Sequence, residues 1–371
     1  HIQGISPGIS RELARSGNPV ERLEEILESI ENGTAAPRVY LDETGKPLEF
    51  HLTELGEYVG AQEKTFDSIS EATEYFYTHR EESNAIRQRS NPLHRSVQAS
   101  LDKARLKKQR LGEDLLQAEN SEKYRLYGEL LTANLHRVEP GAHEVTVISY
   151  YDNQPVTIPL DEKYAASKNA QNYFKKYSKA KTAVHEKTHQ LEETSKDILY
   201  LESVLQSIES AHTLEELNQI REELEDTGYV RKRAQKGFRR KKSKPHPIEY
   251  TLPTGRKVFV GRNNKENDYL TTKMAGKRDL WFHTKDIPGS HVILPLEPNQ
   301  SPEDIPEEII YQVASIAAYH SKGKESQNVP VDFVPIRYVK KPSGAKPGMV
   351  IFTHNTTVYV DPKLPEGADG K

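Results

Sequence analysis

Two long segments with apolar residues at helical spacing constrain the fold of this 371-residue chain most strongly. The first is highly charged, and its apolar positions are Ile86, Leu93, Val97, Leu101, Ala104, Leu111 and Leu115. The second shows intervals of 7, 3, 4 and 3 residues, a heptad seam, through Leu191, Ile198, Leu201, Leu205 and Ile208. Neither helix can bury its seam alone. We therefore predict a long antiparallel coiled coil, with its helices in residues 67–121 and 163–228.

The segment between these helices, residues 122–162, has a different pattern and is predicted to form the tip of the coiled coil. A helical turn from about Leu126 to Leu135 leads through Pro140-Gly141 into an apolar strand. The turn Asp152-Asn153-Gln154-Pro155 leads into a second strand. This pattern predicts a small β-hairpin packed on a helix. The residues leave two roles open: a structural cap on the coiled coil, or a contact surface.

Residues 1–66 combine short helices with strands. The helices are predicted to begin at Ser6-Pro7 and Asn18-Pro19, because proline is favoured in the first helical turn. The loop between them suits a helix-hairpin-helix, whose backbone N–H groups grip nucleic-acid phosphates in other proteins; plain helical packing is the alternative. The second helix carries an apolar stripe of Leu23, Ile26, Leu27 and Ile30. Alternating residues around Glu43-Thr44-Gly45-Lys46 predict a β-hairpin.

The net charge of −3 hides a segregation of charge along the chain. Residues 211–228 are predicted to form an acidic helix capped by Thr213, with Glu216 three residues later. Nine basic residues then fall within fourteen positions that contain no acid: Arg231, Lys232, Arg233, Lys236, Arg239, Arg240, Lys241, Lys242 and Lys244. This basic run lies in a linker, residues 229–247, and we predict that it binds a polyanion. A solvated linker is the alternative. Phe238, the one aromatic residue in the run, argues against base stacking there.

Residues 248–371 are predicted to form a final domain of strands and helices. A hairpin surrounds Pro253-Thr254-Gly255, and an amphipathic helix covers about residues 306–321. A strand is expected across residues 331–339, and residues 349–352 are expected to pair with 357–360 as a second hairpin. The predicted fold class is multidomain α+β: a long antiparallel coiled coil with a small β tip, followed by an α+β domain of mostly antiparallel strands.

The stretch from Gly261 to Leu294 concentrates polar side chains on turns. A short helix is expected from Asp268 to about Met274, and a strand with the one tryptophan of the chain follows it. Trp281 and Phe282 point to opposite faces of that strand, so one of them should be core. Side chains of this kind on turns can hydrogen-bond a nucleic-acid backbone. The candidate RNA-binding residues are Arg262, Asn263, Asn264, Asn267, Asp268, Lys273, Asp279, Trp281, His283, Lys285, Ser290 and His291.

Catalytic and metal sites find no support in this stretch. His283 and His291 stand eight residues apart across a Pro-Gly turn, a spacing that matches no metal motif even with Asp286 added. Asp279, His283 and Ser290 lack the sharp strand-to-helix turn of a nucleophilic serine. The chain contains no cysteine, which excludes disulfides and thiolate metal sites. We expect no enzyme activity, no cofactor and no metal.

Several sequence blocks resemble one known family. NNKENDYLT followed by DLWFHTKDIPGSHVIL is similar to the signature of the NFACT-R domain of the NFACT proteins. GISP with REL near the start, GELL with ANL in the middle, and NAQ with YFKKY after it agree in order. The resemblance covers nearly the whole chain. It implies that the chain corresponds to the C-terminal two thirds of a family member, ending in an RNA-recognition domain.

The resemblance also implies a function and partners. NFACT proteins are ribosome-associated quality-control factors, so the expected partners are the large ribosomal subunit and tRNA, including the alanyl-tRNA used for C-terminal tailing of stalled chains. The tip is then expected to touch the ribosome. Streptococcal members are named fibronectin/fibrinogen-binding proteins, so a surface adhesin for these host proteins is the alternative. Cytoplasm is the expected location, with the cell surface as its alternative. No apolar run approaches the ~20 residues that a membrane span needs.

Overall fold

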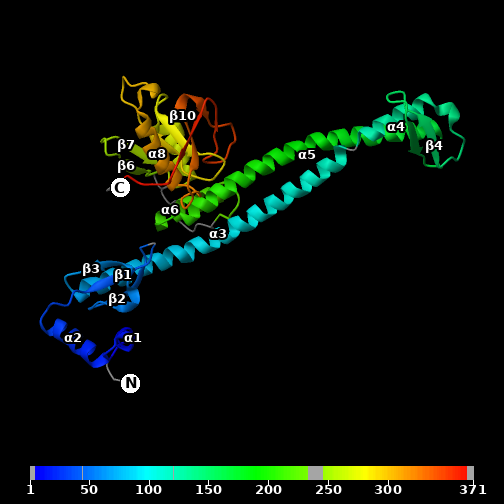
Figure 1. Cartoon of the computed structure of the whole chain (residues 1–371). Coiled ribbons are helices and arrows are strands. Elements are labelled where there is room, and N and C mark those ends of the chain that lie inside the picture. Colours follow the sequence, from blue (N-terminus) through cyan, green and yellow to red (C-terminus); the bar gives the residue numbers. More distant parts are fainter. Residues whose placement is uncertain (1–4, 44, 120, 233–244, 366–371) are drawn as a thin grey trace. The chain divides into compact units, whose positions relative to one another are not determined.

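The computed structural model describes residues 5–43, 45–119, 121–232 and 245–365 (Figure 1). The chain divides into two compact units. The first contains residues 1–93 and 211–217, and the second contains residues 94–210 and 218–371. In the described part of the chain, no helix is both long and apolar enough to cross a membrane.

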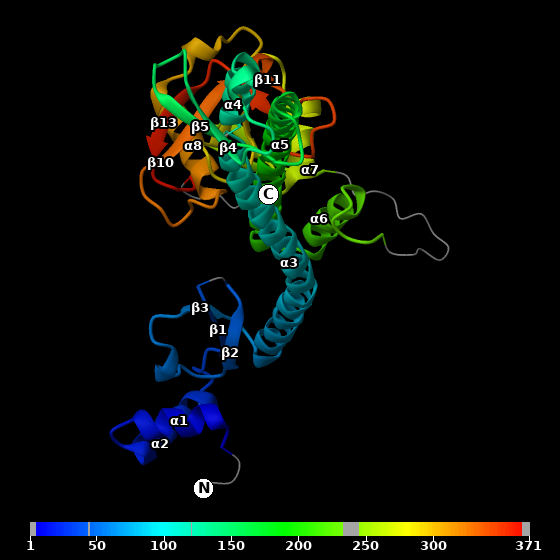
Figure 2. The ribbon, with the colours of Figure 1, turned by 90° about the vertical axis from the view of Figure 1, so that its right-hand side faces the viewer.

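The first unit begins with two adjacent helices, α1 (Pro7–Arg15) and α2 (Pro19–Glu31) (Figure 2). They start at the predicted positions, where Ser6 Oγ accepts from Ile9 N at 3.3 Å and Asn18 Oδ1 accepts from Glu21 N at 3.4 Å. The predicted stripe on α2 is buried only at Ile26. Leu27 and Ile30 of that stripe remain 49% and 44% exposed.

A three-stranded sheet follows in the first unit, in the order β2-β1-β3. The predicted hairpin is confirmed as β1 (Arg38–Leu41) and β2 (Pro47–His51). No sequence pattern predicted β3 (Gln62–Thr65), because its four residues are polar and exposed and show no apolar alternation. Val39 packs with Ala72 and Phe76 at the start of the following long helix, and these three residues form the core of the sheet.

Two long helices confirm the coiled coil: α3 (Ile69–Glu119) and α5 (Ala166–Glu209) (Figure 1). Three side-chain contacts fix their direction within the second unit: His94–Glu209 at 3.3 Å, Arg105–Glu202 at 2.6 Å and Asp114–Lys187 at 2.7 Å. Residue numbers rise along α3 as their partners' numbers fall along α5, so the helices are antiparallel. The predicted seams are buried at Val97, Leu101, Leu111, Ile198, Leu201, Leu205 and Ile208.

The tip contains α4 (Glu122–Ala133) and a hairpin of β4 (Glu144–Ile148) and β5 (Pro155–Pro159), as predicted. The helix begins four residues before the predicted Leu126. Its Leu130 and Leu131 pack against both strands and against α5 in a small core of buried residues. The tip therefore folds around α5 and has a core of its own.

The acidic helix is α6 (Leu214–Asp226), and its predicted cap is present. Glu216 N donates to Thr213 Oγ1 at 3.2 Å, and Thr213 N donates to Glu216 Oε2 at 3.2 Å. The helix is not an open acidic surface, however. Glu223 is buried, and Glu222 pairs with Lys265 at 3.1 Å.

Two residues of the basic run, Arg231 and Lys232, are described, and both are exposed. The other seven lie outside the described residues: Arg233, Lys236, Arg239, Arg240, Lys241, Lys242 and Lys244. The polyanion-binding role of the run stays a prediction.

The last domain is built on a six-stranded sheet in the order β13-β10-β8-β9-β7-β6, and each pair of neighbours is antiparallel. The strands are β6 (Ile248–Thr251), β7 (Lys257–Val260), β8 (Leu280–Thr284), β9 (Val292–Leu294), β10 (Val329–Pro335) and β13 (Thr356–Val360). Helix α8 (Glu307–Tyr319) covers one face of the sheet and buries Phe282.

The opposite face of this sheet is also covered. Here Trp281 packs with Leu270 of a π-helical turn, which continues α7 (Asn264–Tyr269), and with the small hairpin of β11 (Val339–Lys340) and β12 (Ile351–Phe352). Trp281 and Phe282 are therefore both buried, at 1% and 0% exposure. The expectation that only one of them would be core was wrong, because both faces of the sheet are packed.

Three local predictions in this domain were also wrong. The helix expected from Asp268 begins at Asn264, because Asn263 Oδ1 accepts from Glu266 N at 3.1 Å and caps it. The strand expected across residues 331–339 ends at Pro335, where a 3-10 turn follows. The expected second hairpin does not form, since β12 pairs with β11 and β13 pairs with β10. Alternation identifies strands but not their partners.

Candidate nucleic-acid interface

A pocket of about 230 Å³ lies beside the turn between β8 and β9. Residues of this turn, of the loop before β12 and of α5 line it. Six of the predicted site residues come together there: Asn264, Asn267, Trp281, His283, Lys285 and His291. The other six, which are Arg262, Asn263, Asp268, Lys273, Asp279 and Ser290, do not line it.

Aromatic rings form one wall of this β8–β9 pocket. The ring of Trp281 lies parallel to that of His283, with centroids 5.6 Å apart, and meets the ring of His291 edge-on at 5.1 Å. Burial lowers the pKa of both histidines, and for His291 the neighbouring His283 lowers it further. Both rings are therefore neutral near pH 7 and can act only as hydrogen-bonding and stacking groups.

The indole of Trp281 contributes a further polar group. Its Nε1 is buried and, within the described part of the chain, lacks a hydrogen-bond acceptor. A buried donor of this kind costs free energy unless a partner satisfies it. Among the described residues of β8, it is the one buried side-chain donor without a partner.

The predicted asparagines hold the domain together instead of lining an open surface. Asn263 Nδ2 donates to Gln219 Oε1 at 2.7 Å, and Asn264 Nδ2 donates to Glu223 at 3.1 Å. Asn267 Oδ1 accepts from the backbone N–H of His291 at 3.0 Å. All three side chains are buried, so RNA could reach them only if these bonds broke.

Several charged candidates are also engaged within the protein. Arg262 pairs with the buried Glu266 at 3.0 Å. Asp268 pairs with Lys341 and accepts from Gly348 N at 2.9 Å, while Asp279 accepts from Gly276 N at 2.7 Å. The backbone N–H of Ser290 bonds to His320 O at 3.0 Å, which fixes the β8–β9 turn. Of the twelve candidates, the lysines Lys273 and Lys285 are the exposed ones.

The base of the coiled coil meets the last domain at a buried carboxyl group. Glu223 is 1% exposed, and it accepts hydrogen bonds from Tyr200 Oη at 2.8 Å and from Asn264 Nδ2 at 3.1 Å. Lys346 also lies here, 2.6 Å from Asp197 and 4.6 Å from the ring of Tyr229. Burial raises the pKa of Glu223 to about 7, although the two hydrogen bonds oppose this rise.

Stability is expected to depend on pH through Glu223. Its pKa rises from 4.5 to about 7 on folding, so between these values the folded chain keeps a proton that the unfolded chain has lost. The free energy of unfolding therefore falls as pH rises through this window, by roughly 3 kcal/mol in total. Glu223→Gln should then melt at a higher temperature than the parent near pH 8 but not near pH 5. Equal pH dependence of the two melting temperatures would contradict this.

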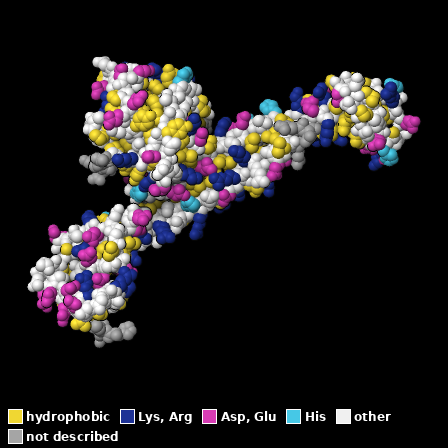
Figure 3. All heavy atoms as spheres, in the orientation of Figure 1, with side chains coloured by type: hydrophobic (Ala, Val, Ile, Leu, Met, Phe, Trp, Pro, Cys, Tyr) yellow, Lys and Arg dark blue, Asp and Glu magenta, His cyan; other side chains and the backbone are white. Residues whose placement is uncertain are grey.

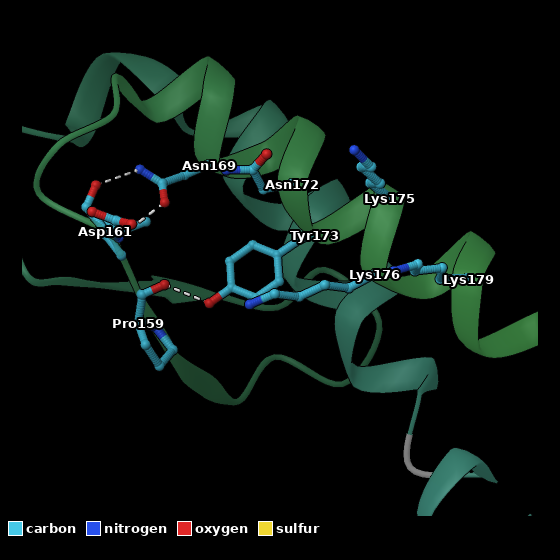
Figure 4. A pocket seen from close by; sticks show the side chains of 9 residues that line it. Pro159, Asp161, Asn169, Asn172, Tyr173, Lys175, Lys176 and Lys179 are labelled. Carbon is cyan, nitrogen blue, oxygen red and sulfur yellow. Dashed lines mark hydrogen bonds between the residues drawn. The ribbon is translucent and has the colours of Figure 1, made fainter.

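A groove of about 640 Å³, which was not predicted from the sequence, lies at the tip (Figure 4). Its floor is fixed by Tyr173, whose Oη donates to Pro159 O at 2.5 Å, and by Asn169, whose Oδ1 accepts from Asp161 N at 2.9 Å. Three lysines of α5 line it: Lys175, Lys176 and Lys179. Among the described residues, none of the three forms an ion pair.

The sequence contained a signal for this groove. Residues 166–185 include five lysines and no acidic residue, whereas α3, α4 and α6 each mix both signs. Lysines and arginines lie on the part of the coiled coil that is next to the tip (Figure 3). Exposed rings lie on the tip as well: Tyr150 and Tyr151 are 58% and 60% exposed, with centroids 4.6 Å apart. Cations with exposed aromatic rings suit a nucleic-acid or ribosomal surface.

Comparisons with known proteins agree with this organisation. Residues 1–244 match the family model "NFACT N-terminal and middle domains", and residues 248–354 match "NFACT protein RNA binding domain". The chain is 39% identical over 98% of its length to "Rqc2 homolog RqcH" of Bacillus subtilis, and 37% identical to the protein of the same name from Streptococcus pneumoniae. It spans 63% of the length of each of these relatives.

A solved structure is also similar. It is the C-terminal part of the fibronectin/fibrinogen-binding protein from Streptococcus suis, with a TM-score of 0.59 and 36% identity. The similarity covers 75% of this chain and 96% of that one. Both family models match in order, and together they cover nearly the whole chain. The chain therefore belongs to the NFACT family.

Proposed function

We propose that this chain is a non-catalytic RNA-binding factor of ribosome-associated quality control. The observation that carries the proposal is the match of residues 248–354 to an RNA-binding domain, in a chain similar to two proteins named Rqc2 homolog. The exposed lysines of the domain, the basic run and the lysine groove at the tip give it the positive surfaces that phosphate binding requires. Cytoplasm is the location that fits this role.

We propose, more specifically, that stalled large ribosomal subunits and tRNA are the partners. The chain would hold a tRNA for C-terminal alanine tailing of the stalled product. Recovery of the chain from lysate and sequencing of the tRNA bound to it tests this point. Enrichment of alanine tRNA over its share of total tRNA is expected. If the bound tRNAs had the same composition as the tRNAs of the lysate, general RNA binding would still be supported, but the alanine-specific role would be contradicted.

We further propose that the tip groove contacts the large subunit. Lys175→Gln, Lys176→Gln and Lys179→Gln together should weaken co-sedimentation with large subunits by about 10-fold or more, because each lost phosphate contact removes a counterion-release contribution. A matched control changes three exposed lysines of α3 to Gln: Lys103, Lys107 and Lys108. The control should lose much less binding. Equal losses in both triple variants would show that only total charge matters.

Binding of host matrix proteins is the second candidate, favoured by the name of the similar Streptococcus suis protein. The acidic helix α6 offers little free charge for it, since Glu223 is buried and Glu222 is paired. Immobilised fibronectin and fibrinogen test it directly. Saturable binding that persists at high salt would support this candidate over RNA binding.

A further inference from the structure

An exposed cluster of rings and cations lies on the last domain, outside the β8–β9 pocket. The rings of Tyr338 and His354 face each other with centroids 4.6 Å apart and planes tilted by 31°. The guanidinium of Arg337 lies over the ring of Tyr338, 4.9 Å from its centroid. Arg337 and His354 are exposed, and Tyr338 is half-buried. Three planar groups are thus held together where solvent can reach them.

The backbone holds His354 in an unusual conformation. Its φ of +62° is left-handed, which side chains other than glycine adopt uncommonly. Thr353 N donates to Tyr338 O at 3.3 Å, and Thr353 Oγ1 lies 2.9 Å from His354 Nδ1, so Thr353 links the turn to Tyr338 and contacts the imidazole. Such conformations persist only when their surroundings enforce them. Here the result is that the imidazole is held beside Tyr338.

Two lysines lie near these rings along the backbone. Arg337 N donates to Lys277 O at 3.0 Å, which brings Lys277 beside the cluster, and Lys340 follows two residues after Tyr338 on β11. Lys277, Arg337 and Lys340 are exposed, and among the described residues none of them forms an ion pair. A hydrogen bond from Ser301 and, to a smaller extent, the charge of Arg337 lower the pKa of Glu303, so this carboxylate lies within electrostatic range of Arg337. Because no ion pair within the described residues neutralises the three cations, they still leave charge available to an anionic ligand.

We propose that the His354 platform, defined as Lys277, Arg337, Tyr338, Lys340 and His354, binds unpaired nucleotides of RNA. A base would stack on the exposed imidazole of His354, which Tyr338 supports, and its flanking phosphates would lie against the three cations. An RNA duplex hides its base faces, so only an unpaired segment such as a loop or an end can use both features. This inference rests on the proposed RNA-binding function and adds the contact surface and the form of RNA to it.

The test uses the full chain and an unstructured ribo-oligonucleotide that carries 2-aminopurine. His354→Asn removes the ring while keeping a residue that tolerates the left-handed conformation. This variant should bind the oligonucleotide about 10-fold more weakly, and the 2-aminopurine fluorescence that stacking quenches in the parent complex should recover.

Two control variants accompany it. Tyr338→Phe keeps both rings and should bind within about twofold of the parent. Tyr311→Asn removes an exposed ring from α8, on the other face of the sheet, and should have no effect. Thermal melts check that each variant is folded.

Three results would overturn the platform while leaving RNA binding in place. The first is that the His354→Asn variant binds with the affinity of the parent chain. The second is that the parent binds a duplex of the same length as tightly as the unstructured oligonucleotide. The third is that a polyglutamate peptide competes as effectively as RNA does, which would indicate a site for acidic proteins. Failure of the parent chain to bind any RNA would instead overturn the proposed function and the platform with it.

Discussion

RNA affinity of the intact chain is expected to fall by about 1,000-fold when salt rises from about 50 to 200 mM. Each cation that neutralises a phosphate releases condensed counterions, so the logarithm of affinity falls by about 0.9 per contact for each tenfold rise in salt. The basic run supplies nine cations within fourteen positions that contain no acid, although Lys232 lies 4.0 Å from Asp226. Roughly six phosphate contacts, drawn from the run and the exposed lysines, are enough for this loss.

A charge-reversed variant separates the basic run from the rest of the surface. Changing Arg239, Arg240, Lys241 and Lys242 to Glu should make the salt slope shallower by about 3 to 4 units and weaken all RNAs about equally, because a linker acts through charge. The control reverses the same number of exposed charges on α3: Lys103, Lys107, Lys108 and Arg110. A fluorescence titration at several salt concentrations measures both. A flat salt dependence of the parent chain would contradict the electrostatic interpretation.

Gly348→Ala is expected to destabilise the last domain strongly. The added Cβ would lie 2.4 Å from Asn264 Oδ1, closer than real contacts allow, and the backbone φ of +75° disfavours a side chain. Asn264 cannot retreat freely, since it bonds both Glu223 and Ser203. The change therefore strains the contact that joins the domain to the base of the coiled coil. A loss of about 3 kcal/mol or more is expected.

Gly344 provides a matched control four residues earlier. It has the same φ of +75°, but no atom lies within 4 Å of an added Cβ. Gly344→Ala should cost only the backbone preference, about 1–2 kcal/mol. The melting temperature of the domain should therefore fall by at least about 4 °C more in Gly348→Ala than in Gly344→Ala. Equal decreases in melting temperature would mean that Asn264 can move away from the added Cβ at Gly348 without strain.

Local sequence patterns predicted the elements of this protein well. Apolar residues at helical and heptad spacing identified both helices of the coiled coil, because neither helix can bury its apolar seam without a partner helix. Turn residues located the tip hairpin, and Ser-x-x-Glu chemistry located the cap at Thr213. These signals are local, so a single sequence contains them in full.

Partners far apart in the chain were predicted less well. Residues 357–360 have the alternation of a hairpin strand, yet their partner is β10, more than twenty residues earlier. The same limit explains the candidate site. Asn263 and Asn264 have the composition of a recognition turn, but Gln219 and Glu223 reach them from α6 and bury them. The lysine groove at the tip and the His354 platform were not predicted. Both depend on which charged side chains stay without an ion pair after folding, and a single sequence does not contain this information.

Co-sedimentation with separated ribosomal subunits tests the proposed function most directly. Purified chain is mixed with large subunits that carry peptidyl-tRNA, with vacant large subunits, and with small subunits, all at low salt. Binding should be strongest to the large subunits with peptidyl-tRNA and should weaken when Lys175, Lys176 and Lys179 are changed to Gln. Absence of the chain from every pellet, or equal binding to small subunits, would contradict a role at the stalled large subunit.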